Sequence, residues 1–464
     1  MSTRVEELAQ FTATACWDDV STPAREQLKM RVLDSVACAL GALDGDVPAR
    51  VRAQIDDFGG EPLCTLIGGG WSAPDRAALY NGTLVRYLDF NDSYVAPGET
   101  CHPSDNFASV LAAAEYAGAD GSDLLTALAV AYQVQCRLSV VAPVRAKGFD
   151  HTVQGAYAVA AGVARALGLD PGRTAHAIAI AGTSLNALRV TRTGGLSNWK
   201  GLAYPAMAGG ATNAAFLAMR GVTGPLEVFE GNKGFIDAIA GPFEIDWARE
   251  NLESVRGTIL KRHNAEIHSQ SALEALLDLR AEHHLSGPEV ERIELDTFQV
   301  AYDIIGGGEE GDKHRVDSKE EADHSLPYLL AVAMLDGQVL PEQYRPERIR
   351  RPDVQDLLQR VEVRPDRELT SRFGAEHPVR LRVHLRDGSV LTREQSDWEG
   401  FHTRPMGWQP LIAKFDRLAR HVNADLRARI VDAIREVDQL QVSELAVLLA
   451  AAARVPAAPS LTSL

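Results

Sequence analysis

Cysteine is scarce in this chain of 464 residues, and the five that occur lie far apart. Their number is odd and no two form a CxxC pair, as the positions show: Cys16, Cys38, Cys64, Cys101 and Cys136. This spacing argues against a disulfide framework, a structural zinc site and a cysteine-ligated iron–sulfur cluster. Because reduced thiols are typical of the cytosol, we expect a cytoplasmic protein.

An excess of positive charge is also lacking, since 47 basic residues face 63 acidic ones and the formal net charge is −16. A chain this acidic is a poor candidate for binding nucleic acid or an anionic membrane surface. If its ligand is itself anionic, the positive charge must be concentrated in one pocket.

Long apolar runs are missing as well. The N-terminus, MSTRVEELAQ, is charged and has no apolar stretch of the signal-peptide kind. The run LLTALAVAYQVQCRL (124–138) is short and interrupted by polar residues, so we expect no transmembrane helix.

Helical patterning dominates the first half of the chain. Apolar residues between positions 28 and 40 recur every fourth residue, which predicts a helix with one face in the core. Segments 122–141 and 155–169 are apolar on almost every side, which is typical of central helices. Segment 205–221 is rich in alanine and glycine. Because glycine weakens helices, we expect it there for close packing.

The pattern changes to strands after about residue 270. Segment 290–298 contains a short strand-like stretch, and segment 378–395 alternates apolar with basic residues around an Asp387-Gly388 turn. This second pattern predicts a half-buried hairpin with a basic outer face.

Three more helical segments follow from about residue 405, and the tail 455–464 has the composition of a disordered end. We therefore predict a mainly α fold with an inserted α+β domain. The expected boundaries are residues 1–267 and 405–464 for an all-helical domain, and residues 268–404 for the inserted domain.

The segment DFNDSYVAPGETCHPSDN (89–106) places four carboxylates around a single histidine, His102. We expect Ser104 to be the N-cap of the helix that follows, which puts His102 at a helix start. The free N–H groups there favour an anion, and His102 beside it could transfer a proton, with Asp92 approaching the same point. A capped helix with a surface histidine is the better supported alternative on this segment alone. A metal site ranks below both because the segment has no HxxxH or DxD spacing.

Other segments add candidates, each weak by itself. His151 follows Asp150 just before an apolar helix, where a capping role is the simpler interpretation. A Gly-rich turn holds cations that suit carboxylate binding, although a solvated loop is equally well supported. The remaining candidates of this kind lie around the turn or near later helix starts: Arg189, Arg192, Lys200, Lys261, His268, Asp323 and His324.

Read in order, these segments resemble the MmgE/PrpD family. The resemblance rests on RYLDFNDSYVAPGETCHPSDN (86–106), GFDHTVQGAYAVAAGVARALGLD (148–170), WKG (199–201), EIHSQSALEALLDL (266–279) and ADHSLPYLLAVAMLDG (322–337). That family contains 2-methylcitrate dehydratase, cis-aconitate decarboxylase and an iminodisuccinate epimerase. The resemblance implies a large all-helical domain, a smaller α+β lid domain, a homodimer, and no need for a metal or an iron–sulfur cluster.

The resemblance also implies site residues. The pocket residues of the decarboxylase branch fall on Asp92, His102, Lys200 and His268, while a pocket threonine of that branch falls near Ala96, which lacks the hydroxyl. LDFND, FDH and IHSQSA are more similar to the dehydratase branch, whereas the WKG lysine is more similar to the decarboxylase branch.

From both lines we predict a cofactor-free lyase acting on a small di- or tricarboxylate, with dehydration of 2-methylcitrate to 2-methyl-cis-aconitate as the first choice. Asp92, His102, Lys200 and His268 are the expected catalytic residues, with Asp92 orienting His102 and the two histidines sharing the acid and base roles. The expected substrate-binding residues are Arg189, Arg192, His151 and Lys261. Decarboxylation of cis-aconitate, epimerisation of a related dicarboxylate, and carboxylate binding without catalysis are the alternatives.

Overall fold

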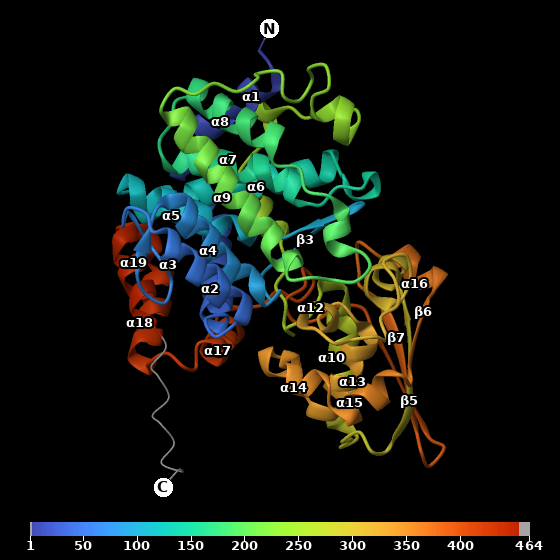
Figure 1. The fold of residues 1–464 in the computed structure, drawn as a ribbon. Helices are drawn as coiled ribbons and strands as arrows, with labels where there is room; N and C mark the ends of the chain where they lie inside the picture. The colour runs from blue at the N-terminus through green and yellow to red at the C-terminus, as the bar shows by residue number, and fades with distance from the viewer. Residues whose placement is uncertain (1, 454–464) are drawn as a thin grey trace.

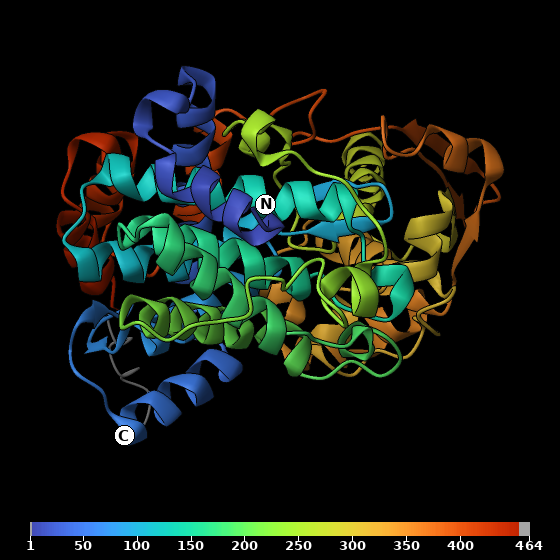
Figure 2. The ribbon, with the colours of Figure 1, turned by 90° about the horizontal axis from the view of Figure 1, so that it is seen from above.

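The computed structural model describes residues 2–453, and the predicted tail at 455–464 lies outside these described residues. Figure 1 shows a large helical unit beside a smaller unit that carries a sheet. Seen from above in Figure 2, the sheet lies at the end of the molecule away from the C-terminal helices. The predicted class, mainly α with an α+β part, is confirmed.

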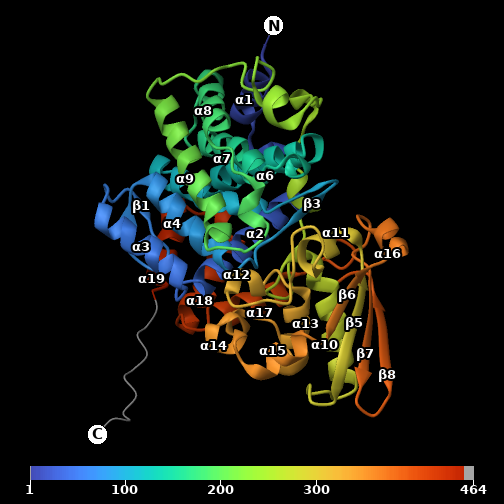
Figure 3. The same ribbon diagram turned by 45° about the vertical axis from the view of Figure 1, so that its right-hand side comes forward.

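The helical unit has one continuous apolar core, made by elements from both ends of the described chain. Of the last three helices, α17 and α18 pack against α2, and α19 packs against α5 and α18; Figure 3 shows them together beside the N-terminal helices. Its helices are α1 Arg4–Thr14, α2 Thr22–Gly41, α3 Asp46–Phe58, α4 Pro74–Tyr87, α5 Phe107–Ala117, α6 Gly121–Val141, α7 Thr152–Ala166, α8 Pro171–Ser184, α9 Trp199–Met219, α17 Trp408–Leu418, α18 Ala424–Arg435 and α19 Val442–Ala451.

Two small antiparallel hairpins belong to the same unit. One pairs β1 Cys64–Thr65 with β2 Trp71–Ser72, and the other pairs β3 Tyr94–Ala96 with β4 Glu99–Cys101. The second hairpin lies at the junction with the smaller unit, where its Glu99 and Thr100 line a cavity.

The smaller unit has its own apolar core between a four-stranded sheet and helices on one face. The strand order is β6-β5-β7-β8, with β5 parallel to β6 and the other pairs antiparallel. Its elements are β5 Val290–Thr297, β6 Val361–Pro365, β7 Val379–Leu385, β8 Val390–Gln395, α10 Gln270–Glu282, α11 Gln299–Ala301, α12 Lys319–Ala322, α13 Leu326–Asp336, α14 Pro346–Ile349, α15 Pro352–Leu358 and α16 Arg367–Arg372.

The alternation read from segment 378–395 is the reason for this sheet. Val379, Leu381 and Val383 are fully buried on one face of β7, whereas Arg382 on the other face pairs with Glu294 of β5. The predicted hairpin is confirmed, and acidic neighbours offset the charge of its basic face. The exact domain boundaries at residues 268 and 404 stay predictions.

Helix α6 is longer than the apolar run 124–138 that was judged too short to span a membrane. Its 21 residues make it long and apolar enough to cross a membrane, so the length argument was wrong. However, 83% of its most apolar window is buried inside the protein, which is the pattern of a core helix. It is the single helix of this kind within residues 2–453, and its length and composition alone are weak evidence for a membrane span.

The glycines of α9 confirm the expected close packing. A Cβ added at Gly209 would lie 3.1 Å from the carbonyl oxygen of Asp75 in α4, and one at Gly210 would lie 3.0 Å from the side chain of Leu185. The first turn of α9 carries Lys200, which contacts Asp323 of the smaller unit.

Candidate active site

A small cavity of about 50 Å³ lies where the two units meet. It brings together six of the eight predicted site residues, namely His102, His151, Arg189, Arg192, Lys261 and His268. Lys200 lies at one edge of this cavity, beside Asp89, and Asp92 lies behind its wall.

The loop that carries His102 is built differently from the predicted cap. Residues Pro103–Asn106 form a 3-10 turn, α5 begins only at Phe107, and Ser104 does not cap it. Instead the Ser104 hydroxyl donates to Asp92 Oδ1 at 2.7 Å, and the Ser104 amide donates to the same oxygen at 3.1 Å. Ser104 therefore bonds to Asp92 and does not cap α5, so the expected role of Ser104 as an N-cap is wrong.

The tautomer of His102 is set by the backbone. Its Nδ1 lies 2.8 Å from the carbonyl oxygen of Asp92 and 3.1 Å from the Ser93 hydroxyl. A carbonyl oxygen only accepts, so Nδ1 carries the proton and the Nε2 lone pair is available for a ligand. Burial lowers the pKa of His102 well below its usual value, and Arg86 and Lys261 lower it further. The ring is therefore neutral at pH 7.

Asp92 holds other residues of the site in place, and its carboxylate makes no hydrogen bond to the His102 ring. Its side chain is fully buried, and its Oδ2 accepts from the Tyr132 hydroxyl at 3.0 Å. Burial raises the pKa of Asp92. Asp92 thus contacts the His102 ring through its main-chain oxygen, and its carboxylate bonds to Ser104 and Tyr132 instead.

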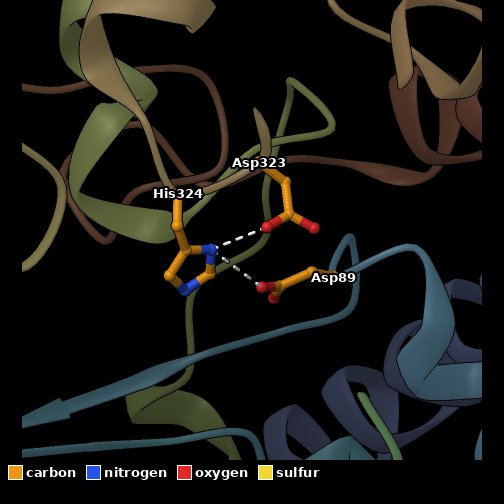
Figure 4. Close-up of side chains that lie close together, drawn as sticks. All are labelled: Asp89, Asp323 and His324. Carbon is orange, nitrogen blue, oxygen red and sulfur yellow. Dashed lines mark hydrogen bonds and ion pairs between the residues drawn. The ribbon is translucent and has the colours of Figure 1, made fainter. Parts of the chain in front are cut away.

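Lys200 is held in a buried cluster that Figure 4 shows in part, with Asp89, Asp323 and His324 pointing toward one another. The ammonium Nζ lies 2.5 Å from Asp323 Oδ1, 2.9 Å from His324 Nδ1 and 3.3 Å from Asp89 Oδ2. Burial lowers the pKa of Lys200, while the two carboxylates favour its charged form. The cluster joins α9 of the helical unit to the start of α13.

Asp89 is the carboxylate shared by three cations at the edge of the cavity. Its backbone φ is 53°, unusual for a residue other than glycine, and its Oδ1 accepts from Arg86 and Lys261 at 2.8 Å each. Burial alone would raise the pKa of Asp89, but Arg86, Lys261 and Lys200 together hold it well below its usual value. Asp89 is therefore ionised.

We expected no metal site in segment 89–106. Its four carboxylates bond to different partners rather than to one common point. Asp92 and Asp89 have the partners given above, while Asp105 accepts from Asn91 and Glu99 accepts from the amides of Val144 and Arg145. Asp89, Asp323 and His324 do lie close enough to hold an ion. The Lys200 ammonium already places a cation among them.

His151 and Arg192 form the opposite wall together with Asp150. The Asp150 carboxylate accepts from Arg192 Nε at 2.5 Å, and its Oδ1 lies 3.3 Å from His151 Nδ1. Burial lowers the pKa of His151 to about 3, and the buried Nε2 has no partner within the protein. His151 is therefore a neutral cavity residue. The simpler interpretation of its motif, a cap, also holds, because His151 is the N-cap position of α7 and Asp150 Oδ1 accepts from the Thr152 amide at 3.2 Å.

The smaller unit contributes His268 from the turn before α10. Both ring nitrogens of His268 are buried without a hydrogen-bond partner in the protein, and burial lowers its pKa well below the usual value. Glu266 lies beside it, with Oε1 3.9 Å from His268 Nε2 and Oε2 accepting from the His268 amide at 2.7 Å. Burial raises the pKa of Glu266 to about 7.

Several cavity residues were missed or undervalued in the sequence: Arg86, Asp89, Glu99, Thr100, Arg145, Glu266 and His324. The Arg86–Asp89 pair is an i,i+3 spacing that could have been read as a salt bridge. Thr100, rather than Ala96, brings a hydroxyl-bearing residue to the cavity, because the β3–β4 hairpin places these positions on different strands. No local sequence pattern predicted that Arg145 or Glu266 would line the cavity.

Comparison with known proteins covers both units. The MmgE/PrpD N-terminal domain matches residues 6–248, and the MmgE/PrpD C-terminal domain matches residues 263–439. The chain is 27% identical over 428 residues to the mitochondrial 2-methylcitrate dehydratase of Yarrowia lipolytica, covering 87% of this chain and 81% of that protein. It is 25% identical over 449 residues to 2-methylcitrate dehydratase of Salmonella typhimurium, covering 89% and 90%.

A relative with a different named activity is about equally similar. The chain is 26% identical over 423 residues to the cis-aconitate decarboxylase of Mus musculus, covering 83% of this chain and 80% of that protein. The names of the relatives therefore agree on small carboxylate substrates and differ in the reaction.

Proposed function

Because this chain belongs to the MmgE/PrpD family, we propose that it is a lyase that dehydrates a small tricarboxylate, with 2-methylcitrate as the first candidate. The observation that carries the proposal is one cavity in which neutral histidines face buried cations. The dehydratase relatives from Yarrowia lipolytica and Salmonella typhimurium support the choice of substrate.

The cations have a defined task in this reaction. Removing a proton α to a carboxylate moves negative charge into that carboxylate, and fixed positive groups stabilise it. Arg192 and Lys261 are held rigidly by Asp150 and Asp89 and would take this role, while Arg189 at the same cavity can bind another carboxylate of the substrate. The proposed chemistry uses these side chains without a cofactor.

The two histidines divide the proton transfers. His102 Nε2, which has a free lone pair, takes the proton from the carbon α to the carboxylate. The adjacent C–OH bond then breaks, and the hydroxide leaves as water with a proton delivered from His268, while the C=C bond forms. Glu266, which keeps a proton up to about pH 7, can supply that proton to His268.

Decarboxylation of cis-aconitate is the second candidate, because the mouse relative is about as similar and Lys200 lies beside the cavity. Epimerisation of a dicarboxylate would use the same proton removal with return to the other face. Carboxylate binding without catalysis is the alternative outside the enzymes.

A substrate panel separates these reactions. Purified protein is incubated with 2-methylcitrate, citrate and cis-aconitate, and the ultraviolet absorbance of an unsaturated product and the release of carbon dioxide are followed. We expect new absorbance with 2-methylcitrate and no gas. Carbon dioxide from cis-aconitate would establish the decarboxylase instead, and thermal stabilisation without turnover would establish a binding protein.

Assembly and location stay proposals. We expect a homodimer in the cytoplasm that binds neither nucleic acid nor membranes, although the Yarrowia lipolytica relative is named as mitochondrial.

A further inference from the structure

We propose that Arg145 and Arg189 form a separate carboxylate subsite of this cavity, and that Glu310 occupies this subsite as an internal competitor of the substrate. The inference rests on the proposed function and deepens it, because a tricarboxylate has a carboxylate to place away from the reacting carbons.

The two guanidinium groups converge on one oxygen. Arg189 Nη2 lies 2.5 Å from Glu310 Oε1, and Arg145 Nη2 lies 3.4 Å from the same atom. Both arginines come from short turns of the helical unit, and both line the cavity. Glu310 comes from the smaller unit, and its side chain is only 3% exposed. A carboxylate from across the junction thus lies where a ligand carboxylate would bind.

The pairing is incomplete in a way that leaves room for a better partner. Glu310 Oε2 and Arg189 Nε are both buried without a hydrogen-bond partner in the protein. A guanidinium and a carboxylate match best through two parallel hydrogen bonds, yet here one oxygen receives both arginines. A ligand carboxylate, free of the constraints of the chain, can accept from Nε and Nη2 of Arg189 together.

The segment around Glu310 is a turn flanked by two glycines. Gly307 and Gly311 have φ angles of 107° and 98°, in the left-handed region that favours glycine. Glu310 lies between them, and its amide donates to the carbonyl oxygen of Asp303 at 2.9 Å. Arg86 and Arg192 pair with Asp89 and Asp150 of their own unit, and Arg189 Nη1 also lies 3.8 Å from Asp150 Oδ2. Glu310 is the carboxylate that reaches Arg189 from the other unit.

Replacing the competing charge tests the proposal directly. Glu310→Gln keeps the shape and removes the charge, and Glu309→Gln is the matched change at the exposed neighbouring position. Calorimetric titration with 2-methylcitrate and with citrate gives the Kd of each protein. We expect a Kd at least about fivefold lower for Glu310→Gln. Removing the Glu310 charge raises the fraction of protein whose subsite is open, and the apparent affinity rises with that fraction. The Kd of Glu309→Gln should equal that of the wild type.

The double variant Glu310→Gln, Arg145→Gln should lose most of the gain, and thermal unfolding of each variant verifies that it is folded. An unchanged or higher Kd for folded Glu310→Gln, with a wild type that binds, overturns this inference alone. A wild type that binds no tricarboxylate overturns the proposed function, and this inference with it.

Discussion

His102 owes its tautomer to a main-chain oxygen rather than to a carboxylate. The Asp92 carbonyl accepts from Nδ1, and the Asp92 carboxylate meanwhile ties together Ser104 and Tyr132 behind the cavity wall. The residue types proposed as reactive were visible in the sequence, but this division between main chain and side chain was not. It follows from the tight 3-10 turn at residues 103–106.

Removing the Asp92 carboxylate should therefore destabilise the fold. Asp92→Ala leaves the Ser104 amide, the Ser104 hydroxyl and the Tyr132 hydroxyl buried without their acceptor. Unpaired buried groups cost about 1–3 kcal/mol each, so we expect a loss of about 3 kcal/mol in the free energy of unfolding by urea. Asp57→Ala, at an exposed position, should change it by less than about 0.5 kcal/mol. Equal effects of the two changes would contradict the positioning role.

Helices α7 and α9 pack closely together; His151 directly precedes α7, and Lys200 lies in the first turn of α9. The contact depends on Gly155 of α7, which faces Tyr204 of α9. Tyr204 in turn stacks on His151 with ring centres 5.9 Å apart and donates to Asn106 at 3.0 Å. The Tyr204 ring thus links the contact between the two helices to His151 in the cavity.

A methyl group at this contact should disturb both stability and the site. The Cβ of Gly155→Ala would lie 2.6 Å from a ring carbon of Tyr204, and overpacking of this kind costs about 1–3 kcal/mol. Gly201→Ala in α9 is the control, since its Cβ would meet nothing within 4 Å and alanine favours the helix by about 1 kcal/mol. Thermal unfolding should rank Gly155→Ala below the wild type and Gly201→Ala at or above it; the reverse order would exclude this role for the contact.

Elements with a clear period were predictable, and the connections that make the site were not. The β7–β8 hairpin and the central helices α6 and α7 follow directly from apolar spacing. The turns that carry Arg145, Arg189 and His268 are 3-10 turns of three or four residues, which leave no periodic pattern. Their positions depend on tertiary packing.

At the scale of the whole molecule, the cavity exists because two separate apolar cores meet along a polar junction. Motif order along the sequence indicated which segments converge, and six of the eight proposed residues do so. Glu310 and Glu266 could not be inferred, because each acts through a contact with a residue distant in sequence or through its burial. The same burial keeps many histidines neutral throughout the protein.

Neutral buried histidines should make the fold sensitive to acid. Burial lowers the pKa of His377 to about 3, from an ordinary value of 6.5, so the unfolded state binds more protons between these values. Stability is therefore lost as pH falls below 6.5, and His377 alone should account for about 2 kcal/mol between pH 7 and pH 5. In urea unfolding at these two pH values, His377→Asn should show a drop smaller than that of the wild type by about this amount.

The matched substitution is His283→Asn, at an exposed histidine, which should keep the wild-type drop. If His377→Asn also keeps it, the neutral state assigned to the buried ring is wrong.

The central claim is that His102 is the base that starts the reaction in the cavity between the two units. The most direct measurement is the kcat of His102→Gln with 2-methylcitrate, compared with the wild type and with His283→Asn, while circular dichroism verifies the fold of each protein. A general base contributes about 10²- to 10⁴-fold, so we expect His102→Gln to lose at least about 100-fold in kcat and His283→Asn to lose nothing. A folded His102→Gln protein with near-normal turnover would contradict the account.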